Sequence, residues 1–340
     1  MPSLDTKGSL CYNGENAVLV SHQTNTQTER FSMNIHHDAF SGADGLSMPY
    51  TLWTPDEPPC AVLAILHGMT EHRGRYTALA EHLTAHGIAC AAFDLRGHGE
   101  HSADADCASL GVGGWSQSLS DLDRFTSLLE ARFPHTPLFC LGFSLGSFLL
   151  REHLAGTEKS YAGAVIIGTG YQPPAVLSVI GAIVGSQVRS FGYDAATPLV
   201  QKLSFDTYNA KFKPNRTASD WLCSDETMLD EYLADPLCRP HISAGLFYDL
   251  LSAMKRTGEK KFAHLYHPNT PILLLSGEED PVGDFGRGVR HVASAMKKAG
   301  ASNITCTLYP GARHDLLHEE VCGAAALARN AITDWIKVHL

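Results

Sequence analysis

The stretch PLFCLGFSLGSFLLREHLAG, residues 137–156, contains one serine between two glycines at the junction of two local patterns. An apolar run of strand length comes before Ser144, and a segment with helical spacing follows it. A G-x-S-x-G nucleophile elbow needs this order of strand, tight turn and helix, with Gly142 and Gly146 allowing the close approach. In a chain with 30 glycines the motif alone is a weak indication, so its surroundings decide.

Apolar strand-like runs alternate with amphipathic helical stretches on both sides of this turn. We expect strands at 61–68, 88–95, 137–143, 161–170, 271–280 and 303–311. Helices are expected between them, at 75–87, 116–133, 146–156, 287–300 and 325–340. This alternation predicts an α/β fold with a mostly parallel, doubly wound sheet flanked by helices.

The alternation is interrupted once, over residues 171–265, which are too many for a simple connection. We therefore expect a mainly helical cap inserted before the last two strands. The core is predicted to comprise residues 31–170 and 266–340. Residues 1–30 are polar and without periodicity, and we interpret them as an N-terminal extension with no assigned chemistry.

The composition excludes several classes of partner. With 26 Lys+Arg against 36 Asp+Glu the net charge is −10, which disfavours nucleic acid and anionic surfaces as electrostatic partners. A neutral or weakly polar small ligand fits better, and no nucleotide-binding motif predicts a cofactor. The sequence leaves the oligomeric state open.

Cysteine usage and the N-terminal segment bear on the compartment. The nine cysteines are scattered, and Cys90 and Cys140 lie inside apolar runs where a thiol behaves as a small hydrophobe. The first twenty residues lack the cationic start and apolar core of a signal peptide. We expect a reduced, cytoplasmic protein without a transmembrane helix.

Two more polar residues stand at the carboxyl ends of predicted strands. Asp280 ends PILLLSGEED (271–280), and His314 follows the strand at 303–311. A serine hydroxyl is a poor nucleophile until a base such as histidine takes its proton, and an acid that holds the imidazole completes the set. The order Ser144, Asp280, His314 therefore predicts a catalytic triad of nucleophile, acid and base.

Neighbouring residues leave alternatives open for two of these roles. Glu278, Glu279 and Asp284 compete with Asp280 for the acid, and His318 competes with His314 for the base.

Acyl transfer also needs donors for a developing oxyanion, which two backbone amides usually supply. One is expected at Leu145, directly after the serine. The other is expected at Met69, in the loop after strand 61–68, where Gly68 permits a close turn. His67 is expected to organise this supporting loop rather than to act as a base.

Five segments, taken as a set, resemble one family. They are HGMTEHRGRY (67–76), FDLRGHGEHS (93–102), GFSLGS (142–147), SGEEDPV (276–282) and YPGARHDLLHE (309–319). They are similar to the monoacylglycerol lipase and lysophospholipase branch of the α/β-hydrolases, often labelled serine aminopeptidase-like, and the resemblance covers about residues 35–340. It implies the α/β-hydrolase fold, the triad Ser144, Asp280 and His314, and oxyanion donors at Met69 and Leu145. YLADPLCR (232–239) also resembles the DPL segment in the cap of monoacylglycerol lipases.

The cap begins with PPAVLSVIGAIVGSQV (173–188), which is apolar on nearly all sides. Two interpretations remain open: a lid helix that lines an acyl tunnel and makes transient contact with membrane, or an ordinary helix buried between cap and core. At 16 residues it is too short to span a bilayer.

Metal binding is not expected from sequence spacing. His82 and His86 stand four apart but lack the Glu of an H-E-x-x-H motif. His314 and His318 have the same spacing, but the predicted triad explains His314 without a metal.

The leading hypothesis is a serine carboxylic-ester hydrolase that forms an acyl-enzyme with monoacylglycerol-like or lysophospholipid-like substrates. One alternative is an aminopeptidase or amidase with the same triad, whose substrate ammonium group would bind to Asp225, Glu226, Asp230 or Glu231. Another is a non-catalytic ligand-binding protein built on the same fold.

Overall fold

The strands form where the sequence places apolar runs that can be buried on both faces of a sheet. The computed structural model describes residues 33–102, 107–238 and 241–340, so the predicted extension 1–30 lies outside the described residues. All six predicted strands are confirmed, with slightly shorter bounds: β3 (Ala61–Leu66), β4 (Ile88–Phe93), β5 (Leu138–Phe143), β6 (Gly163–Ile167), β7 (Ile272–Gly277) and β8 (Ile304–Tyr309). These strands pair in parallel.

Two further strands precede the predicted set. β1 (Met33–Ser41) and β2 (Ser47–Pro55) pair antiparallel with each other, and β2 pairs antiparallel with β4. Within the described residues they complete an eight-stranded sheet with the order β1-β2-β4-β3-β5-β6-β7-β8. The sequence analysis missed β1 because this edge strand is exposed at most positions and buries Phe40 alone. It therefore lacks the alternation of a half-buried strand.

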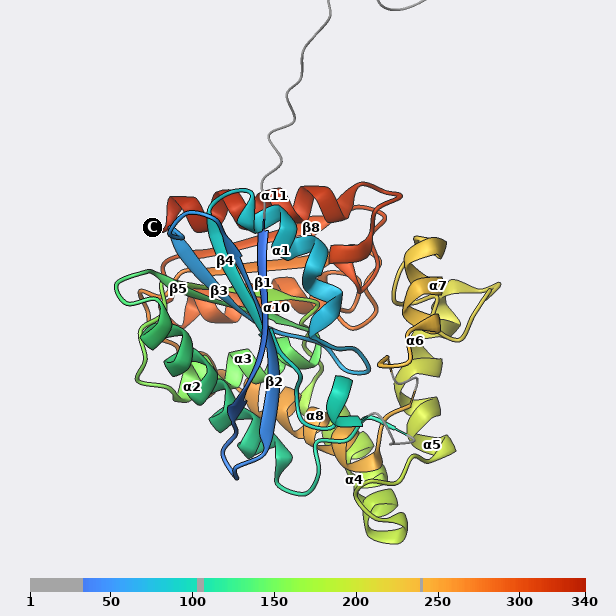
Figure 1. The fold of residues 1–340 in the computed structure, drawn as a ribbon. Helices are drawn as coiled ribbons and strands as arrows, with labels where there is room; N and C mark the ends of the chain where they lie inside the picture. Colours follow the sequence, from blue (N-terminus) through green and yellow to red (C-terminus); the bar gives the residue numbers. More distant parts are fainter. Residues whose placement is uncertain (1–32, 103–106, 239–240) are drawn as a thin grey trace, which may run out of the picture. The chain divides into compact units, whose positions relative to one another are not determined.

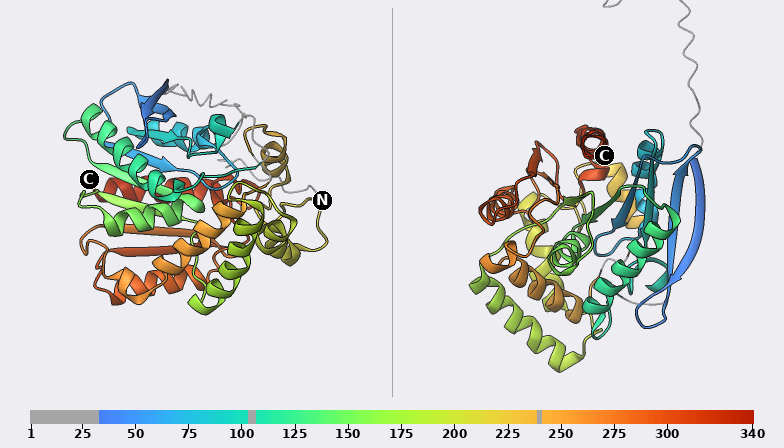
Figure 2. Two further views of the ribbon diagram at one scale, coloured as in Figure 1. Left: turned by 90° about the horizontal axis from the view of Figure 1, so that it is seen from below. Right: turned by 90° about the vertical axis from the view of Figure 1, so that its left-hand side faces the viewer.

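Helices cover both faces of the sheet (Figures 1 and 2). α1 (Thr77–Thr84) and α11 (Ala324–Val338) pack on one face, and α2 (Gly114–Arg132), α3 (Leu145–Gly156) and α10 (Arg287–Lys298) pack on the other. In α2 the residues Leu122, Phe125 and Leu129 recur at helical spacing and are fully buried. The doubly wound architecture is therefore confirmed.

The segment between β6 and β7 is built from helices in its described residues: α4 (Pro174–Phe191), α5 (Pro198–Gln201), α6 (Thr207–Asn209), α7 (Glu226–Ala234), α8 (Ala244–Thr257) and α9 (Lys260–Ala263). α4 lies along α8, and α8 packs on α3 of the core (Figure 1). The described residues from Met33 onward belong to one compact unit, so these helices are anchored to the sheet layer. The exact boundary between core and cap stays a prediction.

The parallel arrangement brings the carboxyl ends of β3, β5, β7 and β8 to one edge of the sheet. Loops that follow such ends form the binding site of open α/β sheets. Here those loops carry Met69, Ser144, Asp280 and His314.

Candidate active site

Ser144 lies on a strained turn between β5 and α3. Its φ of 49° and ψ of −115° are unfavourable for a residue with a side chain. A Cβ at Gly142 would lie 2.4 Å from the carbonyl oxygen of Gly146, and a Cβ at Gly146 would lie 2.3 Å from that of Leu66. Both glycines are therefore required sterically, because any side chain there would push strand and helix apart.

A continuous chain of hydrogen bonds joins the three predicted residues. Ser144 Oγ lies 2.9 Å from His314 Nε2, and His314 Nδ1 lies 2.9 Å from Asp280 Oδ1. The carboxylate can only accept, so Nδ1–H donates to Asp280 and Nε2 is left to accept from the serine hydroxyl. All three residues are buried. This geometry allows His314 to take the serine proton while Asp280 holds the ring.

Asp280 alone among the candidate acids meets His314. Its carboxylate also accepts a hydrogen bond from the backbone of Val282 at 2.8 Å, which fixes its orientation. The three competing carboxylates are substantially exposed and lie near arginines instead: Glu278 near Arg290, Glu279 near Arg313, and Asp284 paired with Arg287.

His318, the competing base, is engaged elsewhere. Its Nδ1 lies 2.8 Å from Asp315 Oδ1 and its Nε2 lies 3.1 Å from the carbonyl oxygen of Arg75. Neither ring nitrogen is available to the serine, so the geometry favours His314.

A buried glutamate fastens the loop of His314 to the cap, a contact that the sequence analysis did not find. Glu319 is fully buried and accepts hydrogen bonds from the backbone of Arg313 at 2.8 Å and of Ser224 at 2.9 Å. The backbone of Asp315 donates to the carbonyl oxygen of Leu222 at 2.7 Å. The loop of His314 is thus held between sheet and cap, and nothing in the spacing of RHDLLHE indicated the cap partner.

The loop after β3 is held by a second buried glutamate. Glu71 accepts from the backbone of Gly68 at 2.5 Å and from Arg75 at 2.8 Å. In the described part of the chain, the backbone amides of Met69 and Leu145 have no hydrogen-bond partner, although those of Gly68, Ser144 and Gly146 do. Two free amides beside the serine are what an oxyanion hole requires.

His67 has the contacts of a residue that organises this loop. Its Nδ1–H donates to the carbonyl oxygen of Gly68 at 2.7 Å, and its Nε2 accepts from the backbone of Leu95 at 2.9 Å. Burial lowers the pKa of His67 to about 4, and burial likewise lowers that of the neighbouring His98 to about 3. Both rings therefore stay neutral in the folded protein near neutral pH.

We expect these two histidines to make the fold sensitive to acid. Because their folded pKa values lie below the ordinary 6.5, the unfolded chain binds more protons once the pH drops below about 6.5. The free energy of unfolding should fall by about 2 kcal/mol per histidine between pH 7 and pH 5. Urea unfolding at a series of pH values measures this, and an unchanged free energy over that range would contradict it.

An uncharged cavity opens above Ser144. Its walls come mostly from the cap and from α3, and they include Phe148, Leu177, Ile180, Tyr208, Trp221, Phe247 and Met254 together with Met69. The ring of Trp221 lies 5.1 Å from that of His314. Its indole Nε1 is buried and, within the described residues, has no hydrogen-bond partner.

The first cap helix, α4, is longer than predicted, and its exposure contradicts one of the two interpretations. α4 runs to Phe191, and its 18 residues are long and apolar enough to cross a membrane by length and composition, contrary to the expectation from 173–188. It is not buried between cap and core, because only Leu177, Val184 and Gly185 are buried. Leu177 and Ile180 face the cavity, while Val179 is 64% exposed.

Comparisons with known proteins agree with this fold and with a hydrolase. Residues 57–321 match the model of the family described as serine aminopeptidase, S33. The monoacylglycerol lipase of Mycolicibacterium smegmatis (strain ATCC 700084 / mc(2)155) is 25% identical over 308 residues, which are 89% of this chain and 97% of that protein. The monoglyceride lipase of Homo sapiens is 28% identical over 295 residues, covering 86% of this chain and 88% of that protein.

The fold itself is shared with solved hydrolase structures. A thermostable carboxyl esterase from Bacillus coagulans, solved in complex with glycerol, superposes with a TM-score of 0.82 at 21% identity, over 90% of this chain and 99% of that chain. The family match spans most of the sequence, from just before β3 to the loop after His314. The chain therefore belongs to the serine aminopeptidase S33 family and is a hydrolase of the serine α/β-hydrolase type.

Proposed function

We propose that the protein is a serine carboxylic-ester hydrolase that acts on monoacylglycerol-like or lysophospholipid-like substrates through an acyl-enzyme. The hydrogen-bond chain from Ser144 through His314 to Asp280, opening into an uncharged cavity, carries this proposal. The relatives named monoacylglycerol and monoglyceride lipase support the substrate class. Apolar walls suit an acyl chain.

The proposed mechanism has two halves. His314 Nε2 takes the hydroxyl proton while Ser144 Oγ attacks the ester carbon, and the oxyanion accepts hydrogen bonds from the Met69 and Leu145 amides. The C–O bond to the alcohol breaks as His314 returns the proton to the leaving oxygen. Water then attacks the acyl-enzyme with His314 again as base, releasing the fatty acid and regenerating Ser144.

The aminopeptidase alternative finds less support in the cap. Asp225 accepts hydrogen bonds from the start of α7 as its N-cap, and Arg216 lies beside Glu226 and Asp230 on the surface. No charged residue belongs to the described lining of the cavity. A substrate ammonium group would therefore enter an apolar site without a counter-ion, which is costly.

The contrast between esters and amides tests this proposal. We expect hydrolysis of p-nitrophenyl esters of medium to long acyl chains, with kcat/KM rising with chain length as methylenes fill the cavity, by up to about fourfold per buried methylene. Aminoacyl p-nitroanilides should be turned over far more slowly. Steady-state kinetics on both series decides the question, and hydrolysis confined to the anilides would overturn the ester assignment.

We also propose that the outer face of α4 makes transient contact with membrane. Val176, Val179 and Ile183 are spaced as one helical face, and all three side chains are substantially exposed. Since Val176 also lines the cavity, a lipid substrate could pass from this face toward Ser144. A cytoplasmic setting is part of the same proposal, and the free, buried thiols of Cys90 and Cys140 support it.

Substitution on α4 tests the membrane proposal. Val179→Asp should weaken co-sedimentation with neutral phosphatidylcholine vesicles severalfold, because it introduces a charge into the apolar face. Hydrolysis of a soluble short-chain ester should be unchanged. Val321→Asp, an exposed valine outside the cap, is the matched control. Equal vesicle binding by wild type and Val179→Asp would rule out contact through this face.

A further inference from the structure

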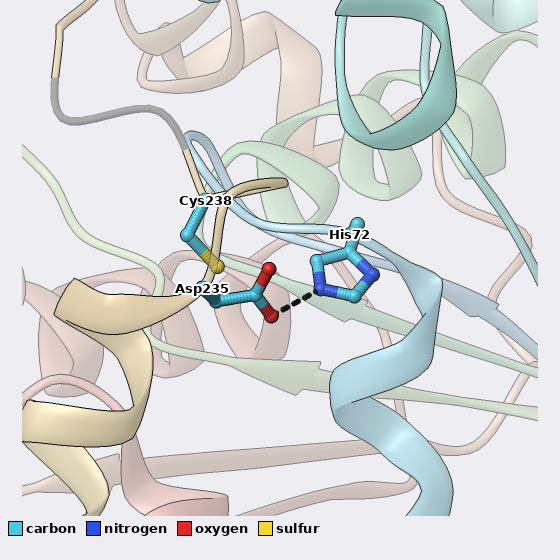
Figure 3. A group of neighbouring side chains, drawn as sticks. All are labelled: His72, Asp235 and Cys238. Carbon is cyan, nitrogen blue, oxygen red and sulfur yellow. Dashed lines mark hydrogen bonds and ion pairs between the residues drawn. The ribbon is translucent and has the colours of Figure 1, made fainter. Parts of the chain in front are cut away.

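Three side chains with metal-binding atoms converge where the loop after β3, which carries Met69, meets the cap (Figure 3). His72 lies three residues beyond Met69, whereas Asp235 and Cys238 follow α7 in the cap. One ligand atom from each of the three lies within 4.8 Å of the other two. No spacing rule could predict this group, because His72 and Asp235 are 163 residues apart in the sequence.

Each of the three residues has one atom placed to bind a metal ion. Asp235 Oδ1 accepts from the backbone of Leu237 at 2.8 Å, which leaves Oδ2 directed at His72 Nε2, also at 2.8 Å. The sulfur of Cys238 has no hydrogen-bond partner within the described residues, and Figure 3 shows it beside the carboxylate of Asp235. The His72 and Asp235 side chains are 12% and 28% exposed, so an ion can enter from solvent.

The distances are compatible with a small tetrahedral ion after modest side-chain rotation. With bonds of about 2.0 Å to nitrogen and oxygen and about 2.3 Å to sulfur, ligand atoms around zinc lie about 3.3–3.6 Å apart. The His72–Asp235 pair would open by about 0.5 Å and the sulfur would move inward by up to about 1.3 Å. His72 Nδ1, which now accepts from Gly74 at 3.2 Å, would take the ring proton and give up that long contact.

The charged groups around the site include three carboxylates and one arginine. Arg75, Glu71 and Asp315 all lie close enough to influence Cys238, and Arg75 is paired with Glu71 at 2.8 Å and with Asp315 at 2.9 Å, so Asp235 is the carboxylate that Arg75 does not pair with. Among the described residues, the Oδ2 atom of Asp235 has the His72 ring as its one partner. Burial raises the pKa of the Cys238 thiol, so it stays protonated until an ion replaces the proton.

We propose that His72, Asp235 and Cys238 form a binding site for a borderline divalent transition-metal ion, best matched by Zn²⁺, with water in the fourth position. Nitrogen, oxygen and thiolate ligands in tetrahedral geometry are the set that zinc prefers. Binding forms a metal–sulfur bond, and the thiol proton is released to solvent. One ligand lies on the loop after β3 and two lie on the cap, so the ion links these two segments. The link lies beside the hydrogen bond that already joins Thr70 to Tyr232.

Cobalt titration of the full-length, EDTA-treated and desalted protein tests the site. We expect one equivalent of Co²⁺ to produce visible bands of tetrahedral cobalt and a near-ultraviolet thiolate-to-cobalt band, both lost on adding Zn²⁺, which binds more tightly. The apparent affinity should rise about tenfold per pH unit between pH 7 and 8, because one thiol proton is released. Bound Zn²⁺ should also raise the melting temperature.

Variants assign the ligands. Cys238→Ser should abolish the thiolate band, and His72→Gln and Asp235→Asn should each weaken Co²⁺ binding by more than about tenfold. Cys60→Ser removes an exposed cysteine elsewhere, and His86→Gln breaks the His82–His86 pair; both should retain the bands. Circular dichroism checks that each variant is folded. A folded wild type without the thiolate band, or a band that persists in Cys238→Ser, would refute the proposal.

Discussion

Replacing Ser144 with alanine is expected to lower kcat for ester hydrolysis by about 10⁶-fold, the size of effect known for a serine nucleophile. The reason is geometric: Ser144 Oγ is the atom that faces His314 Nε2 at 2.9 Å, so its loss leaves the base without a nucleophile. The residual rate should reflect the oxyanion donors and substrate binding alone. KM should change little, because the cavity walls are untouched. Steady-state kinetics with a p-nitrophenyl ester measures both constants.

A neighbouring serine supplies the matched control. Ser147 is buried in the first turn of α3. Its hydroxyl donates to the carbonyl oxygen of Ser144 at 2.6 Å and does not face His314. Ser147→Ala should therefore keep kcat within about tenfold of wild type, since one modest hydrogen bond is lost. If Ser144→Ala retained a kcat comparable to that of Ser147→Ala, the nucleophile would have to be sought elsewhere.

The second large effect is expected for Asp280→Asn, which should lower kcat on the order of 10⁴-fold. The amide has nearly the same shape as the carboxylate. It lacks the charge that stabilises the histidine cation formed during reaction, and it can present a donor to His314 Nδ1 and so favour the wrong tautomer. No solvent can compensate, because Asp280 is fully buried. Kinetics at saturating substrate measure the loss.

Asp284→Asn is the control for this prediction. Asp284 stood close enough in sequence to compete for the acid role, yet its side chain is exposed and pairs with Arg287. Its replacement should change kcat by no more than a few-fold, as expected for a surface ion pair. A near-normal kcat in Asp280→Asn, with a large loss in Asp284→Asn, would reassign the acid.

The parts of the fold that could be predicted are those that depend on a local hydrophobic pattern or on the order of the strands. The six apolar runs became strands because burial on both faces leaves a continuous hydrophobic pattern. Ser144, Asp280 and His314 could be found because each closely follows a strand of a parallel sheet, so their convergence followed from topology. β1 escaped prediction because an exposed edge strand carries no such pattern.

The remaining parts of the site depend on contacts between distant segments. Trp221 beside His314, Glu319 holding Ser224, and the convergence of His72 with Asp235 and Cys238 all join the cap to core loops. The cap is an irregular set of short helices, so no strand order or periodicity fixes where its side chains lie. The length of α4 was also underestimated, because Arg189 and Ser190 interrupt the apolar run before the helix ends at Phe191.

Labelling with a fluorophosphonate, followed by mass spectrometry of the intact protein and of its peptides, tests the proposed nucleophile most directly. An activated serine should attack phosphorus and expel fluoride, leaving a single phosphonyl group on the peptide that contains Ser144. We expect one adduct on wild type and none on folded Ser144→Ala. A folded wild type that remains unlabelled, or an adduct that persists in Ser144→Ala, would contradict the assignment of Ser144 as the nucleophile.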